Sequence, residues 1–255
     1  MPTIIDFNCD LGESFGSWKL GLDEEVVKHV TSVNVATGFH AGDPDVMAST
    51  VKISESLGVG IGAQPGYPDL AGFGRRDIDM TPDQVVNAVT YQMGALAAFT
   101  NDKKLQHLKP HGAMYNKAVR DPAQAAAIVR AGLDFDPTMI QLLLAGSQWE
   151  KVAREAGARV ARECFADRAV TPDGALASRS EPNSVLHDIN EVIDRSLRLV
   201  TEGRVTAVDG TDIDFAADSI CLHGDNPGAV ELAARLRQAF NREGIEIRPM
   251  REFIP

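Results

Sequence analysis

Three short apolar stretches of the sequence carry polar side chains at every second position. These polar residues are Asp6, Asn8 and Asp10 in the first stretch, His107, Lys109 and His111 in the second, and Cys221, His223 and Asp225 in the third. Alternate residues of a β-strand share one face, so the members of each set are presented together. Carboxylates and imidazoles suit general acid–base hydrolysis, in which one group activates water and another protonates the leaving group. A lysine among them can stabilise an oxyanion or hold a carboxylate substrate.

More polar residues follow these or other strand-like stretches and belong to the same candidate site. They are Glu13, His40, Asp43, Gln64, Arg76 and Arg168. The sequence places no serine or cysteine as an obvious nucleophile, and Cys9 faces the side opposite to Asp10 because their positions differ by one.

Several candidates also have an ordinary structural interpretation. Asp10 could cap a turn into the glycine that follows, which is a frequent use of aspartate. Asp6 could form a buried ion pair with Lys109. A single histidine such as His40 could be a structural residue, and Arg76 could belong to a solvated loop rather than bind an anion. The recurrence of histidines at equivalent strand ends nevertheless favours a shared site.

The elements that must position these residues alternate between short β-type stretches and longer amphipathic ones. The predicted strands are Thr3–Cys9, Ser32–Thr37, Val59–Ala63, Leu105–Lys109, Met139–Leu144, Ala158–Phe165 and Ser219–Leu222. The predicted helices are Glu24–Thr31, Asp45–Leu57, Pro82–Phe99, Pro122–Leu133, Ser147–Ala156, Ser184–Thr201 and Pro227–Glu243. We expect Ala166–Asn183 to be a long polar loop and Arg204–Asp218 to be a β-hairpin with a turn at Asp209–Gly210.

Strands separated by helices pair in parallel through right-handed crossovers. Seven such units predict a (β/α)7-type barrel that forms a single domain over residues 1–255, with an open doubly wound sheet as the alternative. The sequence lacks GxGxxG after a strand and lacks GxxxxGK[ST], the nucleotide-binding signatures of that open sheet. In (β/α) barrels the active site lies at the carboxyl ends of the strands, where the polar candidates fall.

Composition excludes several classes of function. The 255 residues carry a formal net charge of −11, which argues against nucleic-acid and anionic-membrane partners because both attract a basic surface. The three cysteines are far apart and show no CxxC spacing, so neither a disulfide framework nor a structural zinc site is expected. The sequence shows no signal-peptide pattern and no apolar run that could span a membrane, so the expected location is the cytoplasm.

Taken together, the polar runs resemble the LamB/YcsF family. The runs that carry the resemblance are Asp6–Gly16 (DFNCDLGESFG), Gly38–Pro44 (GFHAGDP), Pro65–Asp69 (PGYPD), Gly72–Arg76 (GFGRR), Lys109–Asn116 (KPHGAMYN), Phe165–Arg168 (FADR) and His223–Asp225 (HGD). They occur in the family order from Ile5 to about Ile247. The resemblance implies a (β/α)7-type barrel similar to glycoside hydrolase and deacetylase barrels.

The resemblance also implies a reaction. The family includes the A subunit of the bacterial ATP-dependent 5-oxoprolinase, which opens the lactam of 5-oxo-L-proline to L-glutamate while ATP is hydrolysed to ADP and phosphate. It works with B and C subunits, so ATP, with Mg²⁺, is expected at a site shared with those partners. Coupling to ATP is physically reasonable, because an unstrained lactam is a poor electrophile and phosphorylation of its oxygen creates a leaving group.

We hypothesise a role for each candidate, which alanine substitution would test. Asp10 is expected to act as general base or to orient the substrate, with Asp6 supporting it, and Lys109 and His111 are expected to contact phosphate or the developing oxyanion. The remaining candidates are expected to bind substrate: Asn8, Glu13, His40, Asp43, Gln64, Arg76, Arg168, His223 and Asp225.

Two positions depart from the family pattern. Thr37 stands where the family usually has cysteine, and Gln64 stands where it usually has histidine. In similar deacetylase barrels a metal is held by an aspartate and two histidines, which Asp10, position 64 and His111 resemble. Glutamine is a poor metal ligand, so the sequence predicts no dedicated protein-bound metal of that kind. A metal-dependent deacetylase and a non-catalytic subunit that binds a different lactam remain as alternatives.

Overall fold

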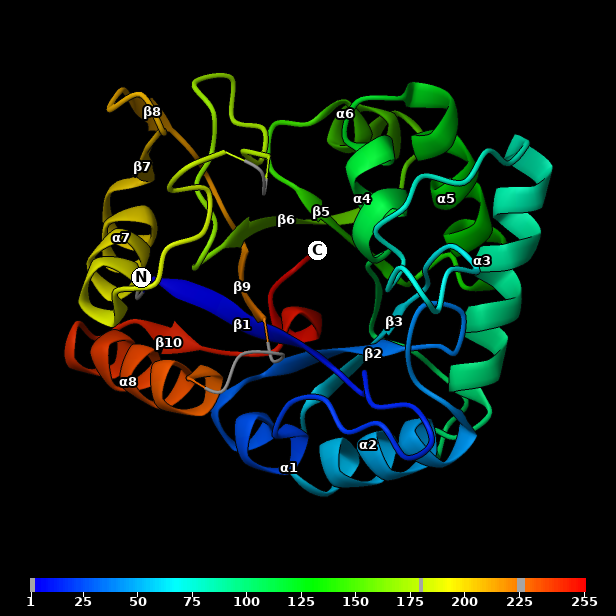
Figure 1. The fold of residues 1–255 in the computed structure, drawn as a ribbon. Coiled ribbons are helices and arrows are strands. Elements are labelled where there is room, and N and C mark those ends of the chain that lie inside the picture. Colours follow the sequence, from blue (N-terminus) through cyan, green and yellow to red (C-terminus); the bar gives the residue numbers. More distant parts are fainter. Residues whose placement is uncertain (1–2, 179–180, 224–227) are drawn as a thin grey trace.

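Seven parallel strands close into a barrel in the computed structural model, which describes residues 3–178, 181–223 and 228–255 (Figure 1). The barrel strands, in pairing order, are β1 (Ile4–Leu11), β2 (Ser32–Ala36), β3 (Gly60–Gln64), β4 (His107–Leu108), β5 (Ile140–Leu144), β6 (Arg159–Phe165) and β9 (Ser219–His223). Strand β1 pairs with both β2 and β9, and the second pairing closes the ring. The predicted barrel is confirmed, and the open sheet is wrong.

Helices surround the barrel and follow the strands along the chain. They are α1 (Asp23–Val26), α2 (Pro44–Ser56), α3 (Pro82–Ala97), α4 (Gly112–Ala118), α5 (Pro122–Phe135), α6 (Gln148–Glu155), α7 (Ile189–Glu202) and α8 (Ala229–Arg242), with a 3-10 turn, η1 (Val27–His29), directly after α1. Side-chain caps fix several starts. Thr81 forms a capping box with Gln84 at α3, and Asp121 caps α5 ahead of a proline.

One predicted helix start differs from the structure, and another lies outside the described residues. Helix α7 begins at Ile189 rather than Ser184, because the carboxylate of Asp188 accepts hydrogen bonds from the first backbone amides of the helix. The helix start predicted at Pro227 lies outside the described residues, and α8 as described begins at Ala229.

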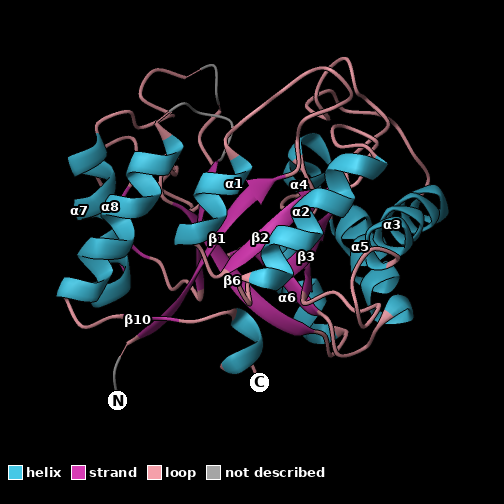
Figure 2. Ribbon diagram, turned by 90° about the horizontal axis from the view of Figure 1, so that it is seen from below, coloured by secondary structure: helices cyan, strands magenta, loops and turns pink. Residues whose placement is uncertain are grey.

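The amino ends of the barrel strands are closed by the C-terminal segment. Strand β10 (Glu246–Ile247) pairs in parallel with β1, and the 3-10 turn η2 (Met250–Glu252) follows it. Met250 and Ile254 pack with Ile140, Leu142 and Ala161 in a small apolar cluster. Figure 2 shows this C-terminal turn on the side of the barrel away from the strand arrowheads. The opposite, carboxyl end is therefore the one left for a site.

The predicted hairpin is confirmed by antiparallel strands β7 (Arg204–Thr206) and β8 (Asp212–Asp214). The described part of the segment predicted as a long polar loop comprises residues 166–178 and 181–183, and it contains no helix and no strand of a sheet. No helix in the described part of the chain is long and apolar enough to cross a membrane.

The barrel interior is polar above that apolar cluster, whereas most of the apolar core lies between the strands and the helices. Glycines make room for the interior side chains. A β-carbon on Gly62 would lie 2.1 Å from His107 Nε2, so only glycine leaves space for that imidazole inside the ring.

Candidate active site

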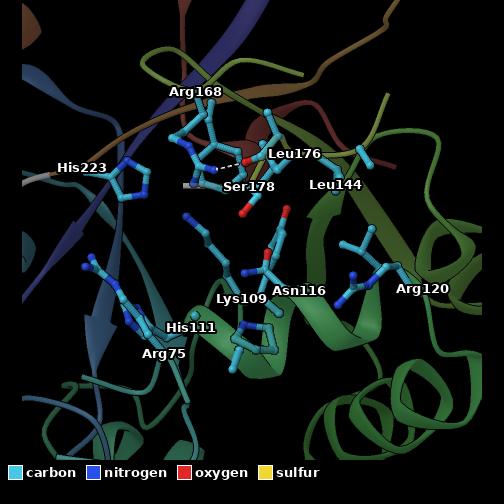
Figure 3. A pocket seen from close by; sticks show the side chains of 18 of the residues that line it. Arg75, Lys109, His111, Asn116, Arg120, Leu144, Arg168, Leu176, Ser178 and His223 are labelled. Atoms are coloured by element: carbon cyan, nitrogen blue, oxygen red, sulfur yellow. Dashed lines mark hydrogen bonds between the residues drawn. The ribbon is translucent and has the colours of Figure 1, made fainter. Parts of the chain in front are cut away.

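A pocket of about 630 Å³ opens at the carboxyl ends of the strands (Figure 3). Strands β1, β5, β6 and β9 contribute to its wall, together with the residues that follow β4, helix α4 and the loop between β6 and α7. Five of the sequence candidates line it: Asp10, Lys109, His111, Arg168 and His223. The predicted location of the site at this end of the barrel agrees with this cavity.

Lys109 lies at the base of the pocket with its ammonium surrounded by buried groups. Its Nζ is 2.9 Å from Asp10 Oδ1, 3.0 Å from Glu163 Oε1 and 2.9 Å from Cys221 Sγ. Burial opposes the charged form, but the carboxylate of Asp10 outweighs it, and the pKa of Lys109 stays well above its usual value. Lys109 is therefore a fixed positive charge rather than a proton donor.

The same ion pair keeps Asp10 ionised. Burial alone would raise the pKa of Asp10, but the adjacent Lys109 ammonium brings it below its usual range. Asp10 Oδ1 also accepts a hydrogen bond of 2.8 Å from the Asn34 amide. The carboxylate is thus held in one orientation at the pocket, which suits a group that positions a substrate or a water molecule.

Beneath Asp10, a chain of polar contacts runs down the barrel interior. Asn34 donates to Asn8, and Asn8 donates to Ser219. Ser219 in turn donates to Asp6, whose carboxyl also accepts from Ser32. Burial raises the pKa of Asp6 to about 6. The structure therefore places Asp6 and Asn8 below the pocket, where they support Asp10 without lining the cavity.

Glu163 and Tyr115 belong to this cluster and were missed by the sequence reasoning. Tyr115 Oη, from α4, donates a 3.0 Å hydrogen bond to Glu163 Oε2. Burial raises the pKa of both groups. Glu163 and Phe165 are two residues apart in one strand and therefore share a face, so strand alternation could have shown that Glu163 faces inward. Tyr115 lies on a helix that was not predicted.

His223 is the best-placed acid–base group in the pocket. Its Nδ1 lies 2.9 Å from Asp167 Oδ2, and its ring stacks on Phe165 with centroids 5.5 Å apart. Burial disfavours the protonated ring, but the Asp167 carboxylate outweighs burial and raises the pKa of His223 above its usual value. The dyad can therefore hold a proton and pass it to a reacting group. Asp167 was not among the predicted site residues.

The pocket is also lined by two arginines that the sequence analysis did not select. Arg75 lies with its guanidinium 5.0 Å from the Phe73 ring centroid, and Arg120 follows α4. Figure 3 shows Arg75, Arg120 and Arg168 on different sides of the cavity. Arg168 is buried and binds the carbonyls of Ser184 and Ala177, so it also holds the pocket loop in place.

Two other candidates are placed elsewhere, and a third is not described. Arg76 pairs with Asp69, and its side chain is 68% exposed outside the pocket lining. Asp43 accepts hydrogen bonds from the backbone amides of Asp45 and Val46 and so caps α2. Neither residue lines the cavity, and both have a structural role. Asp225 lies outside the described residues.

His40, Gln64 and Glu13 lie beside His111 at one side of the site. The rings of His40 and His111 stack with centroids 4.0 Å apart, and His40 Nε2 lies 3.3 Å from Gln64 Oε1. The close approach depends on Gly74, because a β-carbon there would lie 2.7 Å from His40 Cβ. Thr37 supports this side of the barrel by donating hydrogen bonds, among them one of 3.1 Å to the Gln64 carbonyl.

A metal bound as in deacetylase-like barrels does not fit these residues. Asp10 is already held by Lys109 and Asn34. Gln64 offers an amide oxygen where a histidine would be needed, and that oxygen faces His40. The trio of Asp10, Gln64 and His111 therefore provides no metal site of that type.

The chain resembles known proteins along almost its full length. A protein of Thermococcus onnurineus, named as the A subunit of 5-oxoprolinase, is 52% identical over 252 residues, covering 98% of this chain and 99% of that protein. A protein of the same name from Pyrococcus furiosus is 50% identical with the same coverage. The crystal structure of a lactam utilization protein from Thermus thermophilus is 44% identical, has a TM-score of 0.91, and covers 96% of this chain and 99% of that one.

More distant structures share the fold. A T48 deacetylase has a TM-score of 0.51 at 12% identity, covering 98% of this chain and 90% of the other. A GH113 β-1,4-mannanase has a TM-score of 0.52 at 12% identity, covering 94% and 99%. These likenesses confirm the predicted similarity to deacetylase and glycoside hydrolase barrels. The model of the LamB/YcsF family matches residues 5–255. Together with a relative that is 52% identical along almost the whole chain, this match establishes that the chain belongs to the LamB/YcsF family.

Proposed function

We propose that this chain is the A subunit of an ATP-dependent 5-oxoprolinase. In this proposal it opens the lactam of 5-oxo-L-proline to L-glutamate, ATP is hydrolysed to ADP and phosphate, and B and C subunits complete the complex. The observation that carries the proposal is full-length similarity to proteins named as the A subunit of 5-oxoprolinase, combined with a cation-lined pocket at the carboxyl end of the barrel.

The charges of the pocket suit the proposed reactants. 5-Oxoproline carries a carboxylate, and ATP carries phosphates with which Mg²⁺ associates. Arg75 and Arg120 are exposed at the pocket, and guanidinium groups bind carboxylate and phosphate through paired hydrogen bonds. The protein as a whole has a net charge of −11, so this local concentration of cations is a feature of the site rather than of the surface.

The pocket residues can divide the chemical work. Phosphorylation of the lactam carbonyl oxygen activates the ring carbon for attack by water. The ring C–N bond then breaks to leave an acyl phosphate, and a second water releases phosphate and L-glutamate. The fixed charge of Lys109 favours the negative charge that develops at the reacting carbon. The His223–Asp167 dyad, in which the carboxylate raises the pKa of His223, can accept a proton from the attacking water and return one to the ring nitrogen. Asp10 orients the reacting group, because its own carboxylate is held by Lys109 and Asn34.

Reconstitution tests the proposal. The chain is mixed with its B and C subunits, and ADP and glutamate are measured with and without 5-oxoproline. We expect lactam-dependent release of both products. His223→Gln and Asp10→Asn are expected to lower turnover by about 10²–10⁴-fold, the usual contribution of acid–base groups. Arg76→Ala is the matched control, because Arg76 lies outside the pocket, and it should retain activity.

Two results would count against the proposal in different ways. An assembled complex that hydrolyses no ATP with 5-oxoproline would reject this substrate, and a panel of other lactams would follow. Full turnover by both pocket variants would reject a catalytic role for the chain and favour one that only binds substrate.

A further inference from the structure

Three buried side chains converge beside the pocket from separate parts of the chain. Glu13 follows β1, His40 follows β2, and His111 immediately precedes α4. One possible ligand atom from each lies within 4.8 Å of the other two. Two imidazoles and one carboxylate form a ligand set that first-row divalent ions bind in proteins.

The hydrogen bonds of His111 fix which ring nitrogen holds its lone pair. Its Nε2 lies 3.0 Å from the backbone carbonyl oxygen of Phe73, and because a carbonyl only accepts, Nε2 carries the hydrogen. Burial disfavours the protonated ring and lowers the pKa of His111 well below its usual value. Nδ1 therefore holds a lone pair, and it faces Glu13 Oε1 at 3.7 Å. Two acceptors at this separation are suited to a cation between them.

His40 shows the same pattern. Its Nε2 lies 3.3 Å from Gln64 Oε1, an amide oxygen that can only accept. Its Nδ1 is buried and has no hydrogen-bond partner among the described residues. Burial lowers the pKa of His40 to about 4. A buried lone pair without a donor is destabilising unless a ligand satisfies it.

Both rings thus have one nitrogen anchored by an acceptor and the other left with its lone pair. This is the usual arrangement of metal-binding histidines, which donate their second ring N–H to a carbonyl or carboxylate. Gln64 has a defined part in it, because it orients His40 instead of acting as a ligand.

We propose that Glu13, His40 and His111 bind one first-row divalent transition-metal ion, such as Zn²⁺, at the side of the pocket. The site differs from that of deacetylase-like barrels, since it uses Glu13 and His40 in place of Asp10 and position 64. The two rings are now parallel to within 10°, so binding one shared ion requires the rings to turn out of this stack. Because His111 lines the pocket, a bound ion would supply a Lewis acid there.

Metal titration tests the site without lactam, ATP or partner subunits, so its outcome is independent of the proposed function. The purified full-length protein is stripped with a chelator, and Zn²⁺ is titrated by calorimetry with elemental analysis of the product. We expect one ion per chain. Glu13→Gln and His111→Gln should each weaken binding by at least about tenfold. His187→Ala, which removes a histidine outside the cluster, should bind like the unmodified protein.

Cobalt gives a second readout that depends on the ligands themselves. Co²⁺ at a site with nitrogen and carboxylate ligands absorbs visible light, and this absorption should change in both variants but not in the control. Circular dichroism and thermal unfolding show whether each variant is folded, and Glu13→Gln keeps the size and shape of the side chain. Absence of stoichiometric binding by the unmodified protein, or binding and spectra that both variants leave unchanged, overturns the proposal.

Discussion

Replacing Lys109 with methionine tests whether the buried charge cluster is organised as described. Methionine fills most of the volume of the lysine stem but removes the charge. Asp10 and Glu163 then remain in the barrel without the ammonium that lies 2.9 and 3.0 Å away in the native protein. Two buried carboxylates without a cation are strongly disfavoured.

The expected loss is large because the pair is shielded from water. The side chain of Lys109 is 2% exposed and that of Glu163 is fully buried, so solvent screening gives little relief. Removing one partner of such a pair destabilises a protein by about 3–5 kcal/mol. That is a large share of a typical folding free energy of roughly 5–15 kcal/mol. For a domain of this size it corresponds to a fall in Tm of about 6–20 °C.

The loss should also depend on pH, and its sign follows from the pKa shifts. In the native protein the pKa of Asp10 is lowered, so its contribution to stability is present above its unfolded value and disappears as the pH falls. Without Lys109, burial raises the pKa of Asp10 above its unfolded value. The variant therefore gains stability as the pH falls, and the difference between the two proteins narrows at about pH 5.

Urea unfolding followed by circular dichroism, at about pH 7.5 and about pH 5, measures both effects. The double variant Lys109→Met/Asp10→Asn removes one of the unpaired buried carboxylates and should recover part of the lost stability. The coupling free energy between the two substitutions should be about 0.5–3 kcal/mol. A loss below about 1 kcal/mol, or a loss equal at both pH values, would refute the buried ion cluster.

Three further predictions follow from contacts described above. Asp167→Asn removes the carboxylate that raises the pKa of His223, so the limb of the kcat/KM pH profile that reports this group should move to lower pH; an unmoved limb contradicts the dyad. The pKa of Asp6 is raised to about 6, so the native protein should gain about 1.3 kcal/mol of stability from this group as the pH falls from about 7 to about 5. The variant Asp6→Asn should lose most of that pH dependence in urea titrations. Gly62→Ala places a β-carbon 2.1 Å from His107 Nε2 and should destabilise the protein by about 1–3 kcal/mol in thermal melts. Its control, Gly94→Ala, adds a β-carbon in open space on a helix and should stabilise the protein by up to about 1 kcal/mol.

Much of the fold could be predicted because its signals are local. Helix starts such as Thr81 and Asp121 combine a side-chain cap with a following proline, and each of the seven strands shows an apolar run. Helix α4 was missed because His111, the residue before it, makes no side-chain capping hydrogen bond. Strand β10 has only two residues, and its pairing with β1 depends on a contact between the two ends of the chain.

The site could be predicted in part for the same reason. Strand parity placed Asp10 and Lys109 on inward faces, and both line the pocket. Parity does not show depth along the barrel, so Asp6 was grouped with Asp10 although it lies beneath the cavity. Asp43 was wrongly selected as a site residue. The proline that follows it marks a helix start, as it does at other helices, and Asp43 caps α2. Arg120 could not be selected, because its position depends on the missed helix.

The pairing of β1 with β9 sets the order in which the chain can fold as it is synthesised. The hydrogen bond from Ser219 to Asp6 joins residues 213 positions apart. At about 5–20 residues per second, a ribosome needs about 10–40 s to make the intervening chain. During that interval β1 and β6 each present an unpaired edge, which favours association with other chains. A chain that stops before β9 is therefore expected to keep an open sheet that is prone to aggregate.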